Sequence, residues 1–330
     1  MDKVLVTRAV FPDVLDRLSK YFEVEFNPDD QVWSRPQLIE RLQDKAGAFI
    51  TGSERVDAEL LAACPDLRAV CTMAVGYNNI DVEACTARGV WVTNTPDVLT
   101  ETPADFGFAL MMAAARRLSE AERYLRRGEW RKWHYDQLMG ADVHGATLGI
   151  LGMGRIGQAI ARRGALGFGM KVIYHNRTRL PVEVEAAVKA WLVDKATLLR
   201  ESDHLVLVVP YSAASHHTIG EPELALMKPT ATLTNIARGG VVDDAALARA
   251  LQAGRIAAAG LDVYEGEPHL NPALLDLPNV VLSPHIASSS VSTRRAMADL
   301  AADNMIAALG CGPRAGRPPT PVNPGPTGRP

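Results

Sequence analysis

The chain has 330 residues, enough for two domains that each bury a core of their own. Its 35 lysines and arginines nearly balance its 38 aspartates and glutamates, and the net charge of −3 argues against a broad affinity for nucleic acid or anionic lipid. The sequence has no apolar run near the roughly 20 residues of a membrane span, no signal-peptide pattern at its start, and four cysteines without disulfide or metal spacing, so we expect a cytoplasmic protein with reduced thiols.

The N-terminal part alternates short apolar segments with stretches of helical periodicity. The pattern predicts strands at 4–6, 24–26, 48–50, 69–72 and 90–93, with helices near 12–20, 35–45, 57–63 and 80–88. Such alternation is typical of a parallel sheet with crossover helices. One long helix is then predicted over 101–126, because Thr100 suits the N-cap, Glu101 suits the first turn and Pro103 is tolerated there.

A second series of strands and helices begins at residue 147. Strands are predicted at 147–151, 171–174, 205–209, 232–236, 260–263 and 280–283. Short strands separated by helices in this way are typical of a doubly wound dinucleotide-binding sheet. An amphipathic helix is expected over 291–309, followed by an irregular tail rich in proline and glycine. The sequence therefore predicts an α/β protein with two Rossmann-like, doubly wound parallel-sheet domains.

The strongest motif in the chain is a glycine-rich loop after the strand at 147–151. Gly152 suits a tight turn, Gly154 lets the backbone approach a pyrophosphate, and Gly157 lets helix and strand pack closely. Arg155 and Ile156 open the helix, whose free N–H groups favour a phosphate. We expect these five residues to bind a dinucleotide, although a purely structural glycine turn is the alternative.

The turn after the next strand indicates which dinucleotide. An NAD-preferring site places a carboxylate about 20 residues past the glycine motif. Here the turn reads Asn176, Arg177, Thr178 and Arg179, which offers two guanidiniums and a hydroxyl to a 2′-phosphate. We therefore expect NADP(H) to be preferred, with NAD(H) possible. The alternative is a solvated turn with incidental arginines.

Further motifs follow in a fixed order. They are NIARGGVVD at 235–243, GLDVYEGEP at 260–268 and SPHIAS at 283–288, preceded by VGYNNID at 75–81 and NTP at 94–96 and followed by PVNP at 321–324. With the glycine loop, this set resembles the D-isomer-specific 2-hydroxyacid dehydrogenases over nearly the whole chain. Within that family, residues 100–117 and the 176–179 turn are most similar to the glyoxylate/hydroxypyruvate reductases.

The resemblance implies a discontinuous substrate domain, formed by 1–99 and 291–330, around a cofactor domain at 100–290. It also implies that Arg238, Glu267 and His285 are catalytic. An imidazole suits proton donation to a keto oxygen near neutral pH. A carboxylate on its other ring nitrogen would favour the imidazolium and fix the tautomer. The family places that carboxylate directly before proline, which favours Glu267 over Glu265.

Arg238 can bind a substrate carboxylate through its planar fork and polarise the keto oxygen. Each member of the triad also has a plain structural reading. His285 could be an ordinary surface or core histidine, Glu267 part of a solvated acidic loop, and Arg238 half of a surface ion pair. The other seven histidines show no metal-ligand spacing, so no metal is expected, and His216 and His217 are read as a loop pair.

The resemblance also implies roles for residues outside the triad. Asp262 and Thr102 would lie near the nicotinamide, and the backbone N–H groups of Val75 and Gly76 would hold the substrate carboxylate together with Arg238 and His285. Family members form homodimers, and a tryptophan similar to Trp130 or Trp133 reaches the neighbouring subunit's pocket. The alternatives are a structural turn for Val75 and Gly76, a place in the first helical turn for Thr102, and interface packing without a substrate role for the tryptophans.

We therefore expect an NADPH-dependent reductase that converts small 2-keto acids, first glyoxylate and hydroxypyruvate, into D-2-hydroxy acids. One alternative is an NAD-linked dehydrogenase of another acid, such as a phosphoglycerate, or of phosphite. A different class is a dinucleotide-sensing binding protein, since this fold also serves transcriptional corepressors. The near-neutral charge argues against that class.

Overall fold

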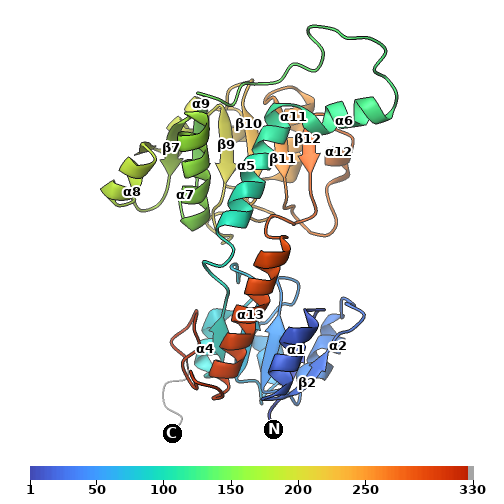
Figure 1. The fold of residues 1–330 in the computed structure, drawn as a ribbon, viewed down its shortest axis with the longest axis vertical. Coiled ribbons are helices and arrows are strands. Elements are labelled where there is room, and N and C mark those ends of the chain that lie inside the picture. The colour runs from blue at the N-terminus through green and yellow to red at the C-terminus, as the bar shows by residue number, and fades with distance from the viewer. Residues whose placement is uncertain (326–330) are drawn as a thin grey trace. The chain divides into compact units, whose positions relative to one another are not determined.

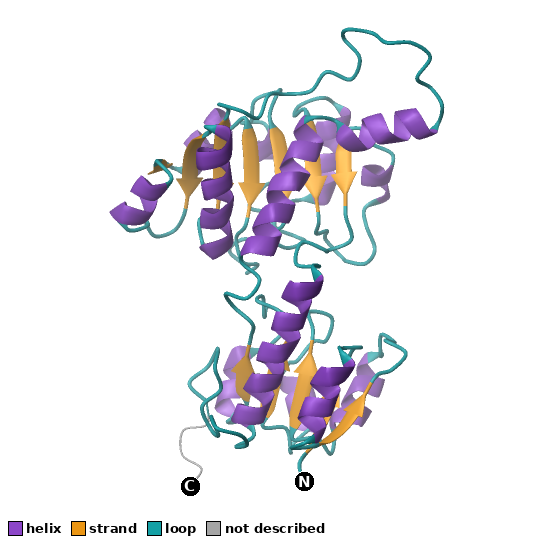
Figure 2. Cartoon of the chain, viewed as in Figure 1, coloured by secondary structure: helices purple, strands orange, loops and turns teal. Residues whose placement is uncertain are grey.

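The computed structural model describes residues 1–325 and contains two compact α/β units. One unit combines residues 1–99 with the described residues 289–325, and the other is the continuous segment Thr100–Ser288 (Figures 1 and 2). Each unit has one sheet, and every strand pairing between the named strands is parallel. The predicted α/β class with two parallel sheets is confirmed.

The discontinuous unit has a sheet of five strands in the order β2-β1-β3-β4-β5. The strands are β1 (Lys3–Val6), β2 (Glu23–Phe26), β3 (Gly47–Ile50), β4 (Ala69–Thr72) and β5 (Trp91–Thr93). Its helices are α1 (Pro12–Ser19), α2 (Arg35–Leu42), α3 (Ala58–Ala63), α4 (Val82–Ala87) and α13 (Val291–Ala308). Apolar side chains of α1 and α13 cover one face of the sheet, and those of α2, α3 and α4 cover the other.

The continuous unit has a sheet of seven strands in the order β12-β11-β10-β9-β6-β7-β8. The strands are β6 (Thr147–Leu151), β7 (Lys171–His175), β8 (Ala190–Leu192), β9 (His204–Leu207), β10 (Thr232–Asn235), β11 (Ala258–Leu261) and β12 (Val280–Leu282). The chain builds outward from β6 in both directions. The boundary between β6 and β9 is therefore the topological switch point, where doubly wound sheets bind ligands.

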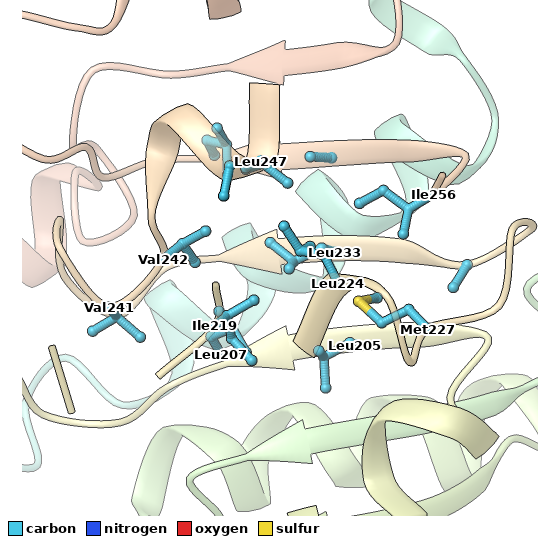
Figure 3. Close-up of a cluster of buried hydrophobic side chains, with 14 of the residues drawn as sticks. Leu205, Leu207, Ile219, Leu224, Met227, Leu233, Val241, Val242, Leu247 and Ile256 are labelled. Carbon is cyan, nitrogen blue, oxygen red and sulfur yellow. The ribbon is translucent and has the colours of Figure 1, made fainter. Parts of the chain in front are cut away.

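Helices cover both faces of this sheet because successive strand residues point to opposite sides. The helices are α5 (Glu101–Ala115), α6 (Leu118–Arg126), α7 (Arg155–Arg162, extended by a π-helical turn at Arg163–Gly167), α8 (Val182–Ala187), α9 (Lys195–Glu201), α10 (Glu221–Leu224), α11 (Asp244–Gln252) and α12 (Pro272–Leu275). Leu205 and Leu207 of β9 pack with Leu233 of β10 and Leu247 of α11 (Figure 3). Val206, between the two leucines, packs on the opposite side with α5 and α7.

The predicted helix over 101–126 is wrong as a single element, because it ends at Ala115 and restarts at Leu118. The N–H of Ala141 donates to the Ala115 carbonyl at 2.9 Å, which removes the acceptor that a continuing helix would use. Arg117 then takes a left-handed φ of 54°. Thr100 does not cap the helix through its side chain, because its own backbone is already helical.

Two of the differences between the predicted and the observed strands have a physical cause in the residues concerned. β8 was not predicted, because it is a three-residue edge strand whose Trp191 and Leu192 are exposed, so no alternating pattern marks it. β11 begins at Ala258, two residues earlier than predicted, because Ala258 and Ala259 carry little strand propensity of their own.

The C-terminal part is more buried than an amphipathic helix and a loose tail would be. The second half of α13 is buried on most sides, including Asn304, whose amide donates to the Asn94 carbonyl and to Thr320 Oγ1. After α13 the chain is irregular, as predicted, but Thr320–Asn323 bonds to β5. The last five residues of the predicted tail, 326–330, lie outside the described residues. Among residues 1–325, no helix is both long and apolar enough to cross a membrane.

Candidate functional site

The predicted site residues of the continuous unit gather at the carboxyl edge of its sheet. Gly152 follows β6, Asn176 follows β7, Arg238 follows β10, Asp262 follows β11 and His285 follows β12. Parallel strands end at one common edge, so motifs far apart in sequence meet there.

The glycine loop has the shape of a phosphate cradle. Gly152 has a φ of +99°, and a Cβ there would lie 2.8 Å from the backbone of Val208. A Cβ on Gly157 would lie 2.5 Å from the Gly152 carbonyl oxygen, so only glycine lets α7 approach β6 this closely. A Cβ on Gly154 would meet nothing within 4 Å. Arg155 and Ile156 form the first turn of α7, where N–H groups have no helical acceptor. The loop therefore fits a pyrophosphate.

Asn176 joins the end of β7 to this loop. Its Oδ1 accepts a hydrogen bond from the Met153 N–H at 2.7 Å. Its side-chain oxygen is therefore used within the protein, to fix the cradle.

Arg179 is held by a carboxylate that the spacing of the sequence did not reveal. Its Nε and Nη2 donate to Glu185 Oε1 and Oε2 at 3.0 and 2.8 Å. The hydroxyl of Tyr174 donates to the same carboxylate at 2.6 Å, and only 7 % of the Glu185 side chain is exposed. The bonds from Arg179 and Tyr174 hold the pKa of Glu185 below its ordinary value. Glu185 therefore occupies one of the two arginines that were expected to be available to a 2′-phosphate.

Arg177 and Thr178 differ from Arg179 in this respect. Both are exposed, and neither side chain has a hydrogen bond or ion pair with another described residue. Within this turn, Arg177 is the guanidinium not tied to a carboxylate of the described chain.

His285 is bonded to Glu267, as the resemblance to the family implies. Its Nδ1 lies 2.7 Å from Glu267 Oε2, and the Tyr264 N–H donates to Glu267 Oε1 at 2.7 Å. Burial by itself would raise the pKa of Glu267, but His285, the Tyr264 amide and Arg238 together hold it below its ordinary value. The Nε2 of His285 bonds to no other described residue, which leaves it for a ligand.

Glu265, the other carboxylate considered as the partner of His285, pairs with His217 instead. Its Oε2 lies 3.0 Å from His217 Nε2. Glu267 is thus the carboxylate that orients His285.

Arg238 lies on a tight loop after β10, close to the Glu267 loop. Asn235 shapes that loop, because its Oδ1 accepts from the Ala237 N–H at 3.0 Å and its Nδ2 donates to the Arg238 carbonyl at 3.3 Å. A Cβ on Gly239 would collide with the Tyr264 carbonyl, so glycine allows the two loops to touch. Burial lowers the pKa of the Arg238 guanidinium, while the charge of Glu267 acts in the opposite direction.

Asp262 is buried and supports the loop that carries His285. Its Oδ1 accepts from the Ile286 N–H at 2.8 Å and from Ser283 Oγ at 2.7 Å, and its Oδ2 accepts from the Ala287 N–H at 2.8 Å. In this structure its carboxylate is used to hold the backbone around His285. A contact with the nicotinamide remains a prediction.

Two residues that support the site have no role that the sequence pattern predicts. One is Asn235, and the other is Tyr264, whose hydroxyl donates to the Leu261 and Ser283 carbonyls, each at 2.9 Å. Burial raises the pKa of Tyr264 to about 12, so it remains a neutral donor. Both lie inside the quoted motifs, but nothing in their spacing indicates which backbone groups they bind.

The remaining predicted residues lie in several other places. Val75 and Gly76 follow β4 in the discontinuous unit, where Asn94 Nδ2 donates to the Val75 carbonyl at 2.8 Å. The N–H groups of Val75 and Gly76 donate to no other described residue. Thr102 is half-buried in the first turn of α5. Trp130 and Trp133 lie beyond α6 and are 54 % and 75 % exposed.

Residues 108–287 match the family model described as the NAD binding domain of D-isomer specific 2-hydroxyacid dehydrogenases. The chain is 50 % identical over 309 residues to a glyoxylate reductase of Thermococcus gammatolerans, with 92 % of each chain covered. It is similar to a crystal structure of a glyoxylate reductase from Paecilomyes thermophila, at a TM-score of 0.87 and 34 % identity over 97 % of this chain and 98 % of that one. It is also similar to an NADPH-dependent glyoxylate/hydroxypyruvate reductase from Sinorhizobium meliloti in complex with NADP and malonate, at a TM-score of 0.85 and 37 % identity over 99 % and 98 %.

Proposed function

Because the chain belongs to the D-isomer-specific 2-hydroxyacid dehydrogenase family, and is therefore an NAD(P)-dependent oxidoreductase of CH–OH groups, we propose that it reduces glyoxylate and hydroxypyruvate. The observation that carries the proposal is the His285–Glu267 pair at 2.7 Å beside the Arg238 loop. The printed names of the relatives support the choice of substrates. The products would be D-2-hydroxy acids.

The dinucleotide, when bound, supplies the hydride for the keto carbon. The glycine loop would hold its pyrophosphate, and Arg177 with Thr178 would bind a 2′-phosphate, which favours NADPH over NADH. Thr102 and Asp262 belong to the same unit, and their side chains are proposed to lie near the nicotinamide ring of the bound cofactor.

The residues of this chain supply the proton donor and the groups that orient the substrate. His285 would donate a proton from Nε2 to the keto oxygen, while Glu267 holds Nδ1 and stabilises the imidazolium. Arg238 would bind the substrate carboxylate and polarise the keto group. The N–H groups of Val75 and Gly76 are proposed as further carboxylate donors.

A substrate and cofactor screen tests the proposal. Glyoxylate, hydroxypyruvate, pyruvate and 2-ketogluconate are each assayed with NADPH and with NADH. We expect kcat/KM to be highest for the first two acids and higher with NADPH. A preference of about tenfold for NADH, equal to roughly 1.4 kcal/mol, would contradict the proposed role of Arg177.

The proton donor is tested by the pH dependence of reduction. A general acid has to carry its proton in order to donate it, so we expect kcat/KM to fall at alkaline pH. A flat profile, with chemistry shown to be rate-limiting, would exclude His285 as the donor.

Arg238→Lys tests whether the planar guanidinium of Arg238 binds the substrate carboxylate through two hydrogen bonds. Lysine keeps the charge but cannot form a bidentate pair, so we expect kcat/KM to fall by about 10²-fold or more. Arg200→Lys serves as the matched control, since Arg200 is an exposed residue on α9. A loss of less than about threefold at Arg238 would place the substrate carboxylate elsewhere.

We also propose that the chain forms a homodimer through α6 and the segment after it. Six large apolar side chains there are more than half exposed, namely Leu118, Leu125, Trp130, Trp133, Tyr135 and Met139. Such a concentration of exposed apolar area is typical of an interface. A cavity of about 640 Å³ lies beside it, lined by Arg117, Met139 and Pro278 among others. Light scattering should give twice the monomer mass, and Trp133→Glu should reduce it, whereas a monomer at all concentrations would overturn the proposal.

A further inference from the structure

A second cluster of polar side chains lies beside the proposed active site but takes no part in its chemistry. His216 and His217 come from the segment between β9 and α10, and Glu265 comes from the loop after β11. One ligand atom from each lies within 4.8 Å of the others. His217 Nε2 and Glu265 Oε2 are 3.0 Å apart, and the two imidazole rings stack with centroids at 3.9 Å.

The backbone holds both sides of the cluster in place. His217 N–H donates to the Gly240 carbonyl at 2.7 Å, and Ile219 N–H donates to the Val241 carbonyl at 3.2 Å. The Glu265 N–H donates to Asp244 Oδ2 at 2.9 Å. The three side chains therefore meet because both loops are hydrogen-bonded to the 240–244 segment, and not because of one surface ion pair.

Further contacts orient the first histidine. The hydroxyl of Tyr211 lies 3.1 Å from His216 Nδ1, and its ring meets the imidazole edge-on at 6.0 Å. A hydrogen bond to one ring nitrogen fixes the plane of a metal-binding imidazole and leaves the other nitrogen as the ligand.

Two imidazoles and one carboxylate form the ligand set of an open zinc site. Imidazole suits Zn²⁺ and its first-row neighbours, whereas Mg²⁺ and Ca²⁺ prefer oxygen ligands. Metal–ligand bonds of about 2.0–2.1 Å place neighbouring ligand atoms roughly 3.3 Å apart, so the His217–Glu265 pair at 3.0 Å has to open slightly and the stacked imidazole rings have to turn. Side-chain rotation allows this, because all three residues lie at or near the surface.

We propose that His216, His217 and Glu265 bind one divalent transition-metal cation, with water completing the coordination. The ion would join the 216–219 segment to the loop that also carries Glu267. The site is separate from the proposed catalytic pair, because Glu267 bonds to His285 and not to either histidine of the cluster.

Calorimetric titration of the untagged full chain with ZnCl₂ tests the proposal. We expect one site per chain, a rise in melting temperature with Zn²⁺, and no binding of Mg²⁺. His217→Asn and Glu265→Gln should each weaken Zn²⁺ binding by about tenfold or more. His134→Asn is the matched control, since His134 is exposed and lies outside the cluster.

Two further variants make the outcome decisive. His216→Asn should weaken binding in the same way, and the melting temperature of each metal-free variant shows whether it is folded. His285→Asn should leave Zn²⁺ binding intact. Zn²⁺ binding that is absent in the wild type, unaffected in all three cluster variants, or lost in His285→Asn would overturn the proposal.

Discussion

His285 combines a strained backbone with a proposed chemical role. Its φ is 53°, a left-handed conformation that costs a non-glycine residue about 1–3 kcal/mol. Two N–H groups directly after it donate to the Asp262 carboxylate at 2.8 Å, and such charge-assisted bonds contribute about 1.5–3 kcal/mol each. The strain is therefore offset by one buried carboxylate, which makes Asp262 a positioning residue for His285.

Glu185 should limit the preference for the phosphorylated cofactor. Glu185→Gln removes a negative charge beside the turn that is proposed to bind a 2′-phosphate, and it releases Arg179. We expect the ratio of kcat/KM for NADPH over NADH to rise by about threefold or more.

Glu183→Gln is the control for that change, because Glu183 is exposed on the same short helix. The two variants should differ also in the Kd ratio of 2′-phosphorylated to unphosphorylated adenosine ligands. An equal ratio in both variants and the wild type would show that Glu185 does not act on the phosphate.

Asp203 should make the free energy of unfolding depend on pH in the acid range. Burial alone would raise its pKa, but the Lys228 ammonium at 2.7 Å and the Thr147 N–H at 2.8 Å hold it below its ordinary value. A lowered pKa in the folded state gives stability that is present above the unfolded pKa and is lost as the pH falls through the folded pKa.

We therefore expect Asp203→Asn to lower the free energy of unfolding near neutral pH by about 1 kcal/mol, a small value because a third of the side chain is exposed. The difference from the wild type should shrink as the pH falls below the ordinary carboxyl pKa of about 3.9 and vanish only below the lowered pKa of the folded state, and urea titrations at several pH values measure it. A difference that is independent of pH would show that the charge is not the cause.

The chemistry of single residues could be read from the sequence, but their partners could not. The resemblance to the family implied the triad of Arg238, Glu267 and His285, and the structure brings these residues together. Glu185 was missed because no rule of spacing links it to Arg179 across the start of α8. The pairing of Glu265 with His217 joins residues 48 positions apart, which only the tertiary structure brings together.

At the level of elements, the outer edge of β5 is covered by the C-terminal segment. Val322 N–H donates to the Val92 carbonyl at 2.7 Å, and Asn323 Oδ1 accepts from the Val92 N–H at 2.9 Å. An exposed edge of this kind would otherwise be a template for pairing with another chain. The segment therefore completes the sheet without forming a strand.

Asn323→Ala should destabilise this edge. Asn323 also donates to the Val90 carbonyl at 2.9 Å and to Thr86 Oγ1 at 3.0 Å, and its side chain is buried. Loss of these bonds leaves buried polar groups unpaired, so we expect the free energy of unfolding to fall by about 2–3 kcal/mol. Asp29→Ala, at an exposed position of the same unit, should change it by less than about 0.5 kcal/mol, and a similar small effect at Asn323 would refute the argument.

The elements themselves were predicted where their pattern is strong. Buried strands such as β4 and β6 have clear apolar runs and were located to the residue. The break between α5 and α6 was missed because both sides have helical propensity, and the chain passing at Ala141 ends the first helix. Long-range contacts of this type are not encoded in a local window.

At the level of the whole molecule, one unit is built from a single continuous segment, whereas the other needs two separate segments of the chain. The continuous unit contains all of its strands and helices between Thr100 and Ser288. The other unit needs α13, whose Ala298, Ala301 and Met305 cover the sheet beside β3 and β4.

A fragment of residues 100–288 should therefore unfold cooperatively on its own, whereas residues 1–99 should not fold. Without α13, one face of that sheet keeps only the apolar cover that α1 provides. Circular dichroism during heating measures both fragments. Adding residues 289–325 to the second fragment should restore a cooperative transition, and a stable fold of 1–99 alone would contradict the expectation.

The discontinuous unit has a consequence for how the chain is made. A ribosome releases residues in order, so the sheet of residues 1–99 emerges first and yet lacks its covering helix until about two hundred further residues have been added. The continuous unit can fold during that interval. The earliest part of the polypeptide is thus the last to reach its native state, and its apolar surface is exposed to chaperones for most of translation.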